Sequence, residues 1–438
     1  MRFEEAEQYI WNRPKFSRKL GLHRVEYILN HFSNPHLKLQ IIHVAGTNGK
    51  GSVSTYIAGV LMEMGYNVGV YTSPHLLKLN ERILLNSIPI DDNQVCRYVE
   101  KLIPVEKEMM DHCGECLSEF EVLTIIALLH YSFENPDFVI LEVGLGGRLD
   151  ATNVCNPILS IITSISLDHQ QFLGDTLEKI TAEKSGIIKE NVPLVVGKQK
   201  DDIVIKTILK KALEFDVKVY FVEEASIVGI GLHGMCVDVK TPFCTKYYHL
   251  ESSMIGLYQS ENIAISVSVI ELLYREGYIS NPKNRISSGI KKSFIPGRMQ
   301  VIDENPIVIV DGAHNEMGLF QLKETVKLFL KKKIISGVIF VTGMMKDKVV
   351  KKQIKELSDL SENTIFVSLD MQRAMTQKEL KEFYFDQNKN SYFEESLEQG
   401  VDIARKIALD KNMAVVVAGS LYLVAEVIAL YMKDSHEK

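Results

Sequence analysis

The sequence predicts an α/β protein built on parallel sheets, with a small antiparallel ribbon and a second α/β part toward the C-terminus. Three observations predict this class. Short, nearly continuous apolar runs alternate with helical periodicity over most of the 438 residues, as in parallel strands covered on both faces. Residues 217–250 are rich in Val, Tyr and Thr, which favours antiparallel strands. A new strand–turn–helix series begins after Pro296 and Gly297.

The individual elements follow from the period of the apolar residues. In the first part, we predict helices at residues 52–64, 176–188 and 259–274, and strands at residues 40–45, 67–71, 138–143, 158–165 and 193–197. After the Pro-Gly pair, we predict strands, each followed by a helical pattern, at residues 307–310, 337–341, 364–369 and 413–418. We therefore divide the chain into residues 1–295 and residues 296–438.

Composition narrows the class of function. The net charge of −6 argues against bulk electrostatic binding to nucleic acid or to an anionic membrane. The N-terminus has no secretory signal, and no apolar stretch reaches the roughly 18 residues of a membrane span. Cys113 and Cys116 form a lone C-x-x-C, without the second pair of a zinc site, so we expect reduced thiols. We expect a cytoplasmic protein that binds neither nucleic acid nor membrane.

The strongest local signal is HVAGTNGKGS at residues 43–52, between a predicted strand and a predicted helix. Backbone N–H groups of the turn, the helix N-terminus and the charge of Lys50 together make a phosphate cradle. The segment departs from the common G-x-x-x-x-G-K-[ST] form, because Ala45 holds the first glycine position and Gly51 follows the lysine. The alternative is a glycine-rich turn with a solvated lysine. The order of strand, glycines, lysine, hydroxyl and helix favours phosphate binding.

Polar residues also follow other strands of the predicted sheet: Ser73, Glu142 and the Asp168–His169 pair. Ligands gather at the carboxyl ends of parallel strands. Glu142 and Ser73 offer oxygen ligands of the kind Mg²⁺ prefers, whereas the imidazole of His169 is less expected. A capping or turn-stabilising role is the alternative for each of them.

For four further residues, an ordinary structural role has to be weighed against a role in a functional site. Lys184 lies near the C-terminus of a predicted helix, where the dipole favours a cation, and periodicity gives it no other role. Arg298 follows the Pro-Gly pair and can hold phosphate with two hydrogen bonds. Asp311 and His314 lie in a strand-to-helix turn, a common place for site residues. Together, Arg298, Asp311 and His314 suggest that the second domain closes over a nucleotide held by the first.

The ordered set of motifs resembles one family. GTNGKGS, TSPHL, ERI, EVGLGGRLDATN, DH, EKSGI, PGR, DGAHN and GSLYL span residues 46–423, and the chain is similar to the folylpolyglutamate synthase and dihydrofolate synthase family of the Mur ligases. This resemblance implies a P-loop Mur-ligase-like domain over residues 1–295 and a smaller Rossmann-like ligase domain over residues 296–438.

The resemblance also implies the reaction. ATP phosphorylates a carboxylate of folate or dihydropteroate, the amine of L-glutamate attacks the acyl phosphate, and the products are an amide, ADP and phosphate. Cations offset the repulsion between the two anionic reactants. We expect a monomer. One alternative is a related Mur-type amide ligase acting on a non-folate carboxylate; another is a non-catalytic ATP-binding module, which need not keep the whole set of site residues.

Site residues follow from the resemblance position by position. It assigns the ATP phosphates to Gly49, Lys50, Gly51 and Ser52, and other contacts with ATP to Asn262, Arg298 and Asp311. It places His314 near the transferred phosphate, and it surrounds Mg²⁺ with Ser73, Glu142 and His169. Lys184 matches a lysine that is carbamylated in family members, as a ligand of a second Mg²⁺. The pterin and substrate pocket is assigned to Phe120, Glu121, Leu149, Asp150 and Ala151.

Two segments depart from the family's usual pattern. The family usually has His-Gln, with the Gln three residues before an Asn. Here Tyr258 stands before Gln259, and the Asn is Asn262. Gln372-Arg373-Ala374 lacks the usual leading Pro. Neither change removes a proposed phosphate or metal ligand, but both bear on which acceptor is used.

Overall fold

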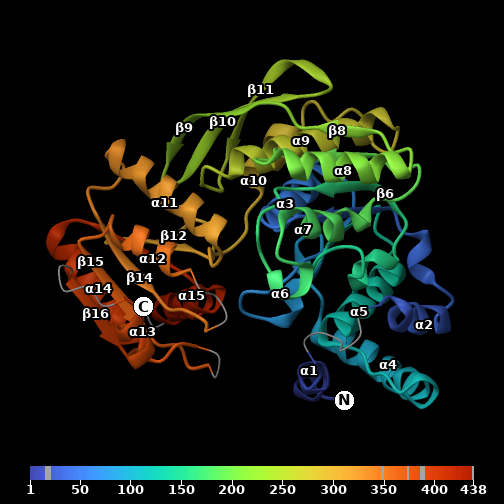
Figure 1. The fold of residues 1–438 in the computed structure, drawn as a ribbon, viewed down its shortest axis with the longest axis horizontal. Coiled ribbons are helices and arrows are strands. Elements are labelled where there is room, and N and C mark those ends of the chain that lie inside the picture. The colour runs from blue at the N-terminus through green and yellow to red at the C-terminus, as the bar shows by residue number, and fades with distance from the viewer. Residues whose placement is uncertain (15–20, 347–349, 372–373, 385–389, 437–438) are drawn as a thin grey trace. The chain divides into compact units, whose positions relative to one another are not determined.

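The computed structural model describes the chain except for residues 15–20, 347–349, 372–373, 385–389 and 437–438 (Figure 1). It forms two compact units. The first comprises Met1–Ala225, Val239–His249 and Glu261–Lys292, and the second comprises Ser226–Asp238, Leu250–Ser260 and Ser293–Lys438. The division at residues 295 and 296 stays a prediction, because the second unit also takes in two earlier segments.

The first unit is built on an eight-stranded sheet. Its strands, in spatial order, are β4 (Ile88–Pro89), β3 (Ile83–Leu85), β2 (Val68–Tyr71), β5 (Phe138–Glu142), β1 (Ile41–Ala45), β6 (Pro157–Ile162), β7 (Leu194–Val196) and β8 (Val219–Phe221). From β2 to β8 neighbouring strands are parallel, while β3 pairs antiparallel with β2. Every residue of β1 is buried, which fits its nearly continuous apolar sequence. The carboxyl ends of six strands therefore share one edge of the sheet.

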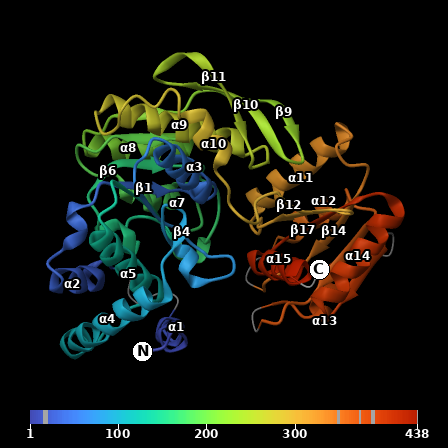
Figure 2. The same cartoon turned by 180° about the vertical axis from the view of Figure 1, so that it is seen from behind.

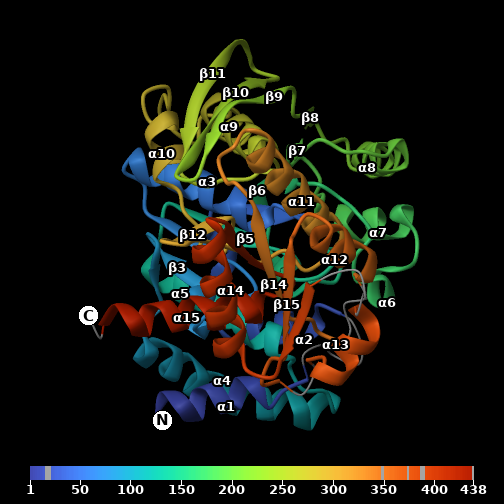
Figure 3. The same cartoon turned by 90° about the vertical axis from the view of Figure 1, so that its left-hand side faces the viewer.

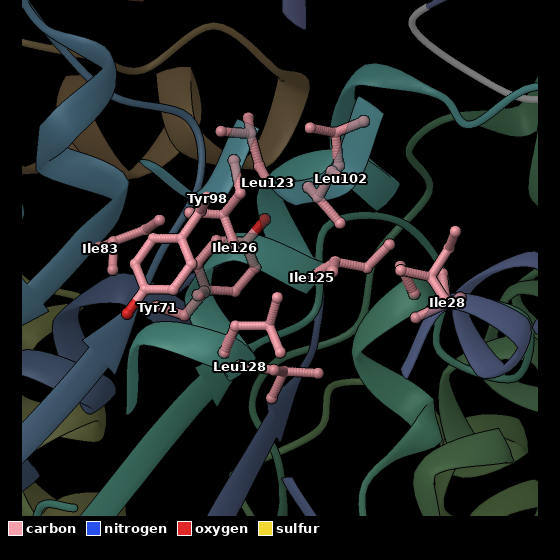
Figure 4. Close-up of a cluster of buried hydrophobic side chains, with 14 of the residues drawn as sticks. Ile28, Tyr71, Ile83, Tyr98, Leu102, Leu123, Ile125, Ile126 and Leu128 are labelled. Carbon is pink, nitrogen blue, oxygen red and sulfur yellow. The ribbon is translucent and has the colours of Figure 1, made fainter. Parts of the chain in front are cut away.

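The first unit also contains α-helices, some on the sheet and some packed on other helices. They are α1 (Phe3–Trp11), α2 (His23–His31), α3 (Lys50–Glu63), α4 (Asp92–Cys113), α5 (Glu119–Glu134), α6 (Gln170–Leu173), α7 (Leu177–Lys184), α8 (Asp202–Glu214), α9 (Gln259–Arg275) and α10 (Ile286–Lys292). Helix α3 packs on β2 and β5, and α10 packs on α3. A Cβ atom at Gly289 would lie 2.4 Å from the Cα of Val60, so only glycine permits this approach. Figure 4 shows the core beside α5, where Ile28, Leu102 and Leu123 meet from three helices.

A separate sheet contains β9 (Ala225–Gly231), β10 (Gly234–Thr241) and β11 (Cys244–Ser252), in the order β11-β10-β9 (Figure 2). Two-residue connections join successive strands, which only antiparallel strands allow. The predicted ribbon begins later than expected. Residues near 217 belong to β8, which extends the parallel sheet, since its Val219–Phe221 backbone pairs with β7.

The second unit has a six-stranded sheet. Its strands, in spatial order, are β12 (Gln300–Glu304), β13 (Ile307–Asp311), β17 (Ala414–Ala418), β14 (Val338–Thr342), β15 (Asn363–Val367) and β16 (Asn390–Glu394). Only β12 runs antiparallel to its neighbour; Figure 3 shows β14 and β15 side by side. Its helices are α11 (Glu316–Lys331), α12 (Lys351–Ser358), α13 (Gln377–Tyr384), α14 (Leu397–Lys411) and α15 (Leu421–His436). Strands β12 and β16 were not expected from the sequence.

The predicted α/β class is confirmed, with its parallel sheet, small antiparallel sheet and second α/β part. Among the helices of the described residues, none is long and apolar enough to cross a membrane. Cys113 ends α4 and, like Cys116, is an exposed free thiol.

Candidate active site

The glycine-rich turn between β1 and α3 forms the centre of the site. Gly46 and Gly49 both have positive φ angles, 151° and 87°. A Cβ atom would lie 1.8 Å from Thr163 Oγ1 at Gly46, and 2.4 Å from Asn262 Oδ1 at Gly49. Both positions therefore require glycine. Gly49 is also the N-cap of α3, so the helix begins at a residue with no side chain to cover its first N–H groups.

Lys50 lies over this turn. Its Nζ donates to the carbonyl oxygens of Gly46, at 3.3 Å, and Thr47, at 3.4 Å. The same Nζ is 3.8 Å from Oε1 of Glu142, the last residue of β5. Ser52 is buried in the first turn of α3. The backbone turn, the helix N-terminus and the lysine thus meet as the sequence predicts for a phosphate cradle.

Thr72 brings a third strand end to this place. It follows β2, and its hydroxyl donates to Glu142 Oε2. A Cβ atom at Gly51 would lie 3.6 Å from the same oxygen. The Glu142 carboxylate therefore faces the first turn of α3, between a hydroxyl and an ammonium group.

Lys184 reaches the turn from the last position of α7. It is 5% exposed, and its Nζ donates to the Gly46 carbonyl oxygen at 2.7 Å. Burial, followed by the charge of Lys50, lowers the pKa of Lys184 to about 7. A lysine with this pKa is largely neutral near pH 8 and can act as a nucleophile. Lys184 does lie at the end of a helix, as expected from the sequence, but its side chain is buried.

Ser73 and His169 lie at strand ends as expected, but their roles as ligands stay predictions. Ser73 is half-buried and follows Thr72. His169 is the N-cap of α6, its side chain is 40% exposed, and its Nε2 is 3.9 Å from Asp168 Oδ1. Within the described residues, no three His, Cys, Asp or Glu side chains gather as a metal site.

The predicted substrate-pocket residues converge on the loop after β5. A Cβ atom at Gly144 would lie 2.4 Å from the Phe120 ring. Asp150 Oδ2 accepts hydrogen bonds from the N–H groups of Gly144 and Leu145, at 3.0 and 2.8 Å. Half-buried Leu149 and buried Ala151 flank Asp150. The carboxylate of Asp150 thus holds this loop in shape.

Glu121 is turned toward a different partner. Its Oε2 accepts the Ser118 N–H at 2.7 Å and caps α5, while its Oε1 lies 2.9 Å from Arg24 Nη2. Arg24 is also buried, and its Nη1 donates to Glu115 Oε2 at 2.6 Å. The position of Glu121 fits a structural ion pair, and its contact with substrate stays a prediction.

In the second unit, Asp311 ends β13 and is buried. Its carboxylate accepts hydrogen bonds from Met299 N–H and Ala313 N–H, both at 2.8 Å, and from the Tyr258 hydroxyl at 3.1 Å. Burial raises the pKa of Asp311, and the charge of Arg298 opposes this. Arg298 lies beside Gly312, where a Cβ atom would come within 3.2 Å of its Nη1. The PGR and DGAHN motifs therefore form one cluster.

His314 follows in the same turn. Its Nδ1 is 2.8 Å from the Gly312 carbonyl oxygen, so Nδ1 carries the proton and Nε2 is the basic nitrogen. Asn315 then caps α11 by accepting the Gly318 N–H at 2.8 Å.

Sequence reasoning missed three residues of these clusters. Thr72 was quoted in TSPHL but not selected, although it directly follows a predicted strand. Tyr258 was noted only as a departure from the family, and its hydroxyl bonds to Asp311. No local signal marks Arg24, because its carboxylate partners lie more than 90 residues away in the sequence. In the other departing segment, Gln372 and Arg373 lie outside the described residues.

Family models identify the class of protein. A model described as "Mur ligase middle domain" matches residues 44–270. A second, described as "Dihydrofolate synthetase, C-terminal domain", matches residues 298–430. Together with the phosphate cradle, they define a Mur-type ATP-dependent ligase.

Individual relatives narrow this class. A dihydrofolate synthase/folylpolyglutamate synthase of Bacillus subtilis is 36% identical, with 97% of this chain and 98% of the relative covered. The structure of a Thermotoga maritima folylpolyglutamate synthase is 30% identical, with a TM-score of 0.83, covering 99% of this chain and 97% of that chain. A Mycobacterium tuberculosis folylpolyglutamate synthase complexed with ADP and AMPPCP shares the fold, at 24% identity, a TM-score of 0.87 and 98% coverage of both chains. The chain belongs to the folylpolyglutamate synthase and dihydrofolate synthase family, which confirms the resemblance.

Replacing Tyr258 by Phe removes one of the hydrogen bonds to the buried Asp311 carboxylate. We expect Tyr258→Phe to lower the free energy of unfolding by about 1.5–3 kcal/mol, the usual contribution of a hydrogen bond to a charged group. Urea denaturation of the full chain measures it. Tyr422→Phe is the matched control, because the Tyr422 side chain is exposed in α15. Equal losses in the two variants would contradict the role of the Tyr258 hydroxyl.

Proposed function

We propose that this ligase joins L-glutamate to a folate-type carboxylate, using ATP to form an acyl phosphate. The acceptor is dihydropteroate, a reduced folate, or both. The observation that carries the proposal is the convergence of Lys50, Glu142 and Lys184 on the turn at Gly46. Family membership supports the acceptor class, because the B. subtilis relative carries the names of both activities.

The reaction needs positive charge around the transferred phosphoryl group, because two anions must approach each other. The first N–H groups of α3 and the ammonium of Lys50 supply it in the first unit. Arg298, His314 and Asp311 of the second unit, and Asn262 of the first, are the further residues that we propose as contacts of the nucleotide. The Nδ1 of His314 donates to the Gly312 carbonyl oxygen.

Mg²⁺ fits the donors at the end of β5. Glu142 is a buried carboxylate, and the hydroxyls of Thr72 and Ser73 follow β2, which are the hard oxygen donors that Mg²⁺ prefers. When bound, Mg²⁺ neutralises charge on the ATP phosphates. His169 is the fourth group we assign to this site.

A carbamate on Lys184 explains how a buried lysine tolerates its neighbour. A neutral amine is the form that reacts with CO₂, and the pKa of Lys184 is lowered to about 7, first by burial and then by Lys50. The carbamate is anionic, so it replaces repulsion of Lys50 by attraction. Its oxygens would be the hard, anionic ligands that a second Mg²⁺ prefers.

Mass spectrometry tests the reaction. Purified protein is incubated with ATP, Mg²⁺ and L-glutamate, and with either dihydropteroate or tetrahydrofolate. The gain of one glutamate on both acceptors assigns a bifunctional enzyme, and gain on one assigns that activity. No gain on either, with ATP-binding retained, moves the acceptor outside the folates, as in the alternative of a related Mur-type amide ligase. ATP binding without acceptor-dependent ADP release would indicate a non-catalytic module.

The monomeric state, the cytoplasmic location and the absence of nucleic-acid binding stay predictions.

Thr72→Val removes the hydroxyl that holds Glu142. We expect the Mg²⁺ concentration for half-maximal activity to rise roughly tenfold, because groups that orient a metal ligand have effects of this size. Activity measured over a range of Mg²⁺ concentrations gives the value. Thr72→Ser keeps the hydroxyl and is the control. If Thr72→Val needs the same Mg²⁺ concentration as the parental protein, Thr72 does not orient Glu142 for metal binding.

Lys184→Ala tests the carbamate. The variant is expected to lose activity and to regain part of it with added short carboxylates, which replace the missing anionic ligand. Steady-state rates with and without acetate provide the measurement. Full activity without any additive would rule out a carbamate ligand at position 184.

A further inference from the structure

A buried row of polar side chains lies beneath the predicted substrate loop. His43, in the middle of β1, is completely buried, and its Nε2 is 2.8 Å from Thr152 Oγ1. Its Nδ1 is 3.6 Å from the Sγ of buried Cys155. Thr152 Oγ1 in turn lies 2.5 Å from Asp150 Oδ1. The row therefore runs Cys155, His43, Thr152, Asp150, and neither the phosphate cradle nor the proposed metal site uses His43.

The hydrogen bonds in this row have one direction. Asp150 Oδ1 accepts Thr152 N–H and O–H, and Oδ2 accepts the N–H groups of Gly144 and Leu145. Burial raises the pKa of Asp150, and these hydrogen bonds oppose that rise; since N–H and O–H donors supply all four bonds to its two oxygens, the geometry fits an ionised carboxylate. The Thr152 hydroxyl donates its hydrogen to Asp150, so its oxygen must accept the hydrogen bond from His43.

His43 is therefore the Nε2–H tautomer. Burial lowers its pKa to about 3 and raises that of the Cys155 thiol to about 12. A neutral imidazole and a protonated thiol follow, and the Cys155 S–H donates to Nδ1. Each donor and acceptor in the row is thus matched, and reversing one bond would leave another buried group unpaired.

The row connects two segments that the reaction needs. Within the row, His43 lies three residues before Gly46, whose carbonyl oxygen accepts a hydrogen bond from Lys184. At one end of the row, Asp150 fixes the N–H groups of Gly144 and Leu145, two and three residues after Glu142. Phe120 packs on the same Gly144. Within the row, the side chain of His43 links β1 to Thr152 and, through Thr152, to Asp150 and this loop.

We propose that His43 is a positioning residue for the acceptor: its Nε2–H fixes the Thr152 hydroxyl toward Asp150, which holds residues 144–150 in the shape that receives the folate-type substrate. This inference rests on the proposed function. A buried histidine satisfied by its neighbours is the structural alternative. The two differ, because a positioning role changes acceptor binding selectively, whereas a structural role changes stability and all substrates together.

Two pairs of variants separate these roles. Gln places an amide N–H near the position of Nε2 and can donate to Thr152, whereas the shorter Asn reaches only the level of Nδ1. We expect His43→Asn to raise the KM of the acceptor about fivefold to tenfold, the equivalent of one hydrogen bond, with the KM of ATP unaltered. His43→Gln retains the parental values. Thr152→Val repeats the loss from the other partner, and Thr152→Ser repeats the rescue.

Amide hydrogen exchange gives a second readout that needs no substrate. The N–H groups of Gly144 and Leu145 are expected to exchange faster in His43→Asn and Thr152→Val than in the parental protein, and peptides from the second unit are expected to keep their rates. If His43→Asn does not fold, the Thr152 pair carries the test. Parental exchange rates in Thr152→Val, or equal increases in the KM of acceptor and ATP, would overturn the proposal. A parental protein that ligates neither acceptor would refute the proposed function instead, while the exchange measurement still tests the row.

Discussion

Two lysine side chains share the carbonyl oxygen of Gly46, and this concentration of positive charge is the constraint around which the site is arranged. Lys184 donates to that oxygen at 2.7 Å and Lys50 at 3.3 Å. Burial lowers the pKa of Lys184, and the nearby charge of Lys50 lowers it further, because like charges shielded from water repel strongly. Glu142 on the neighbouring strand supplies part of the compensation. The remaining positive charge is suited to the phosphates of ATP.

The parallel sheet makes this arrangement possible. β1 lies between β5 and β6, so the glycine-rich turn, Glu142 and Thr163 emerge at one edge of the sheet. The turn is then held from below by side chains of the β6 end: Thr163 Oγ1 donates to the Asn48 carbonyl oxygen at 2.7 Å. Because a Cβ atom at Gly46 would overlap the same hydroxyl, the turn and its support fix each other's position.

Much of this could be predicted from the sequence, and the exceptions have physical causes. Continuous apolar runs identified the buried parallel strands, and the order of glycines, lysine and helix identified the cradle, because both signals are local. The network of His43, Thr152 and Cys155 was not predicted, since each residue is an ordinary core or turn residue until the fold joins positions 43 and 155. In the sequence, Lys184 has the position of an ordinary cation at the end of a helix. Its lowered pKa results first from burial in the folded protein, so the sequence alone does not indicate it. The strand near residue 219 was misassigned, because a three-residue β-rich segment fits a parallel edge and an antiparallel ribbon equally well.

The packing of α10 on α3 has a consequence for how the chain is made. Gly289 lies against Val60, so the helix that begins at the phosphate cradle is covered by a segment encoded more than 200 residues later. The first unit closes only after Lys292 has left the ribosome, although its sheet is complete at Phe221. Until then the surface of α3 at Val60 lacks the helix that covers it, and apolar surface exposed during folding favours aggregation. A fragment that ends after the eighth strand, at Phe221, would lack α10 and would leave the surface of α3 around Val60 uncovered.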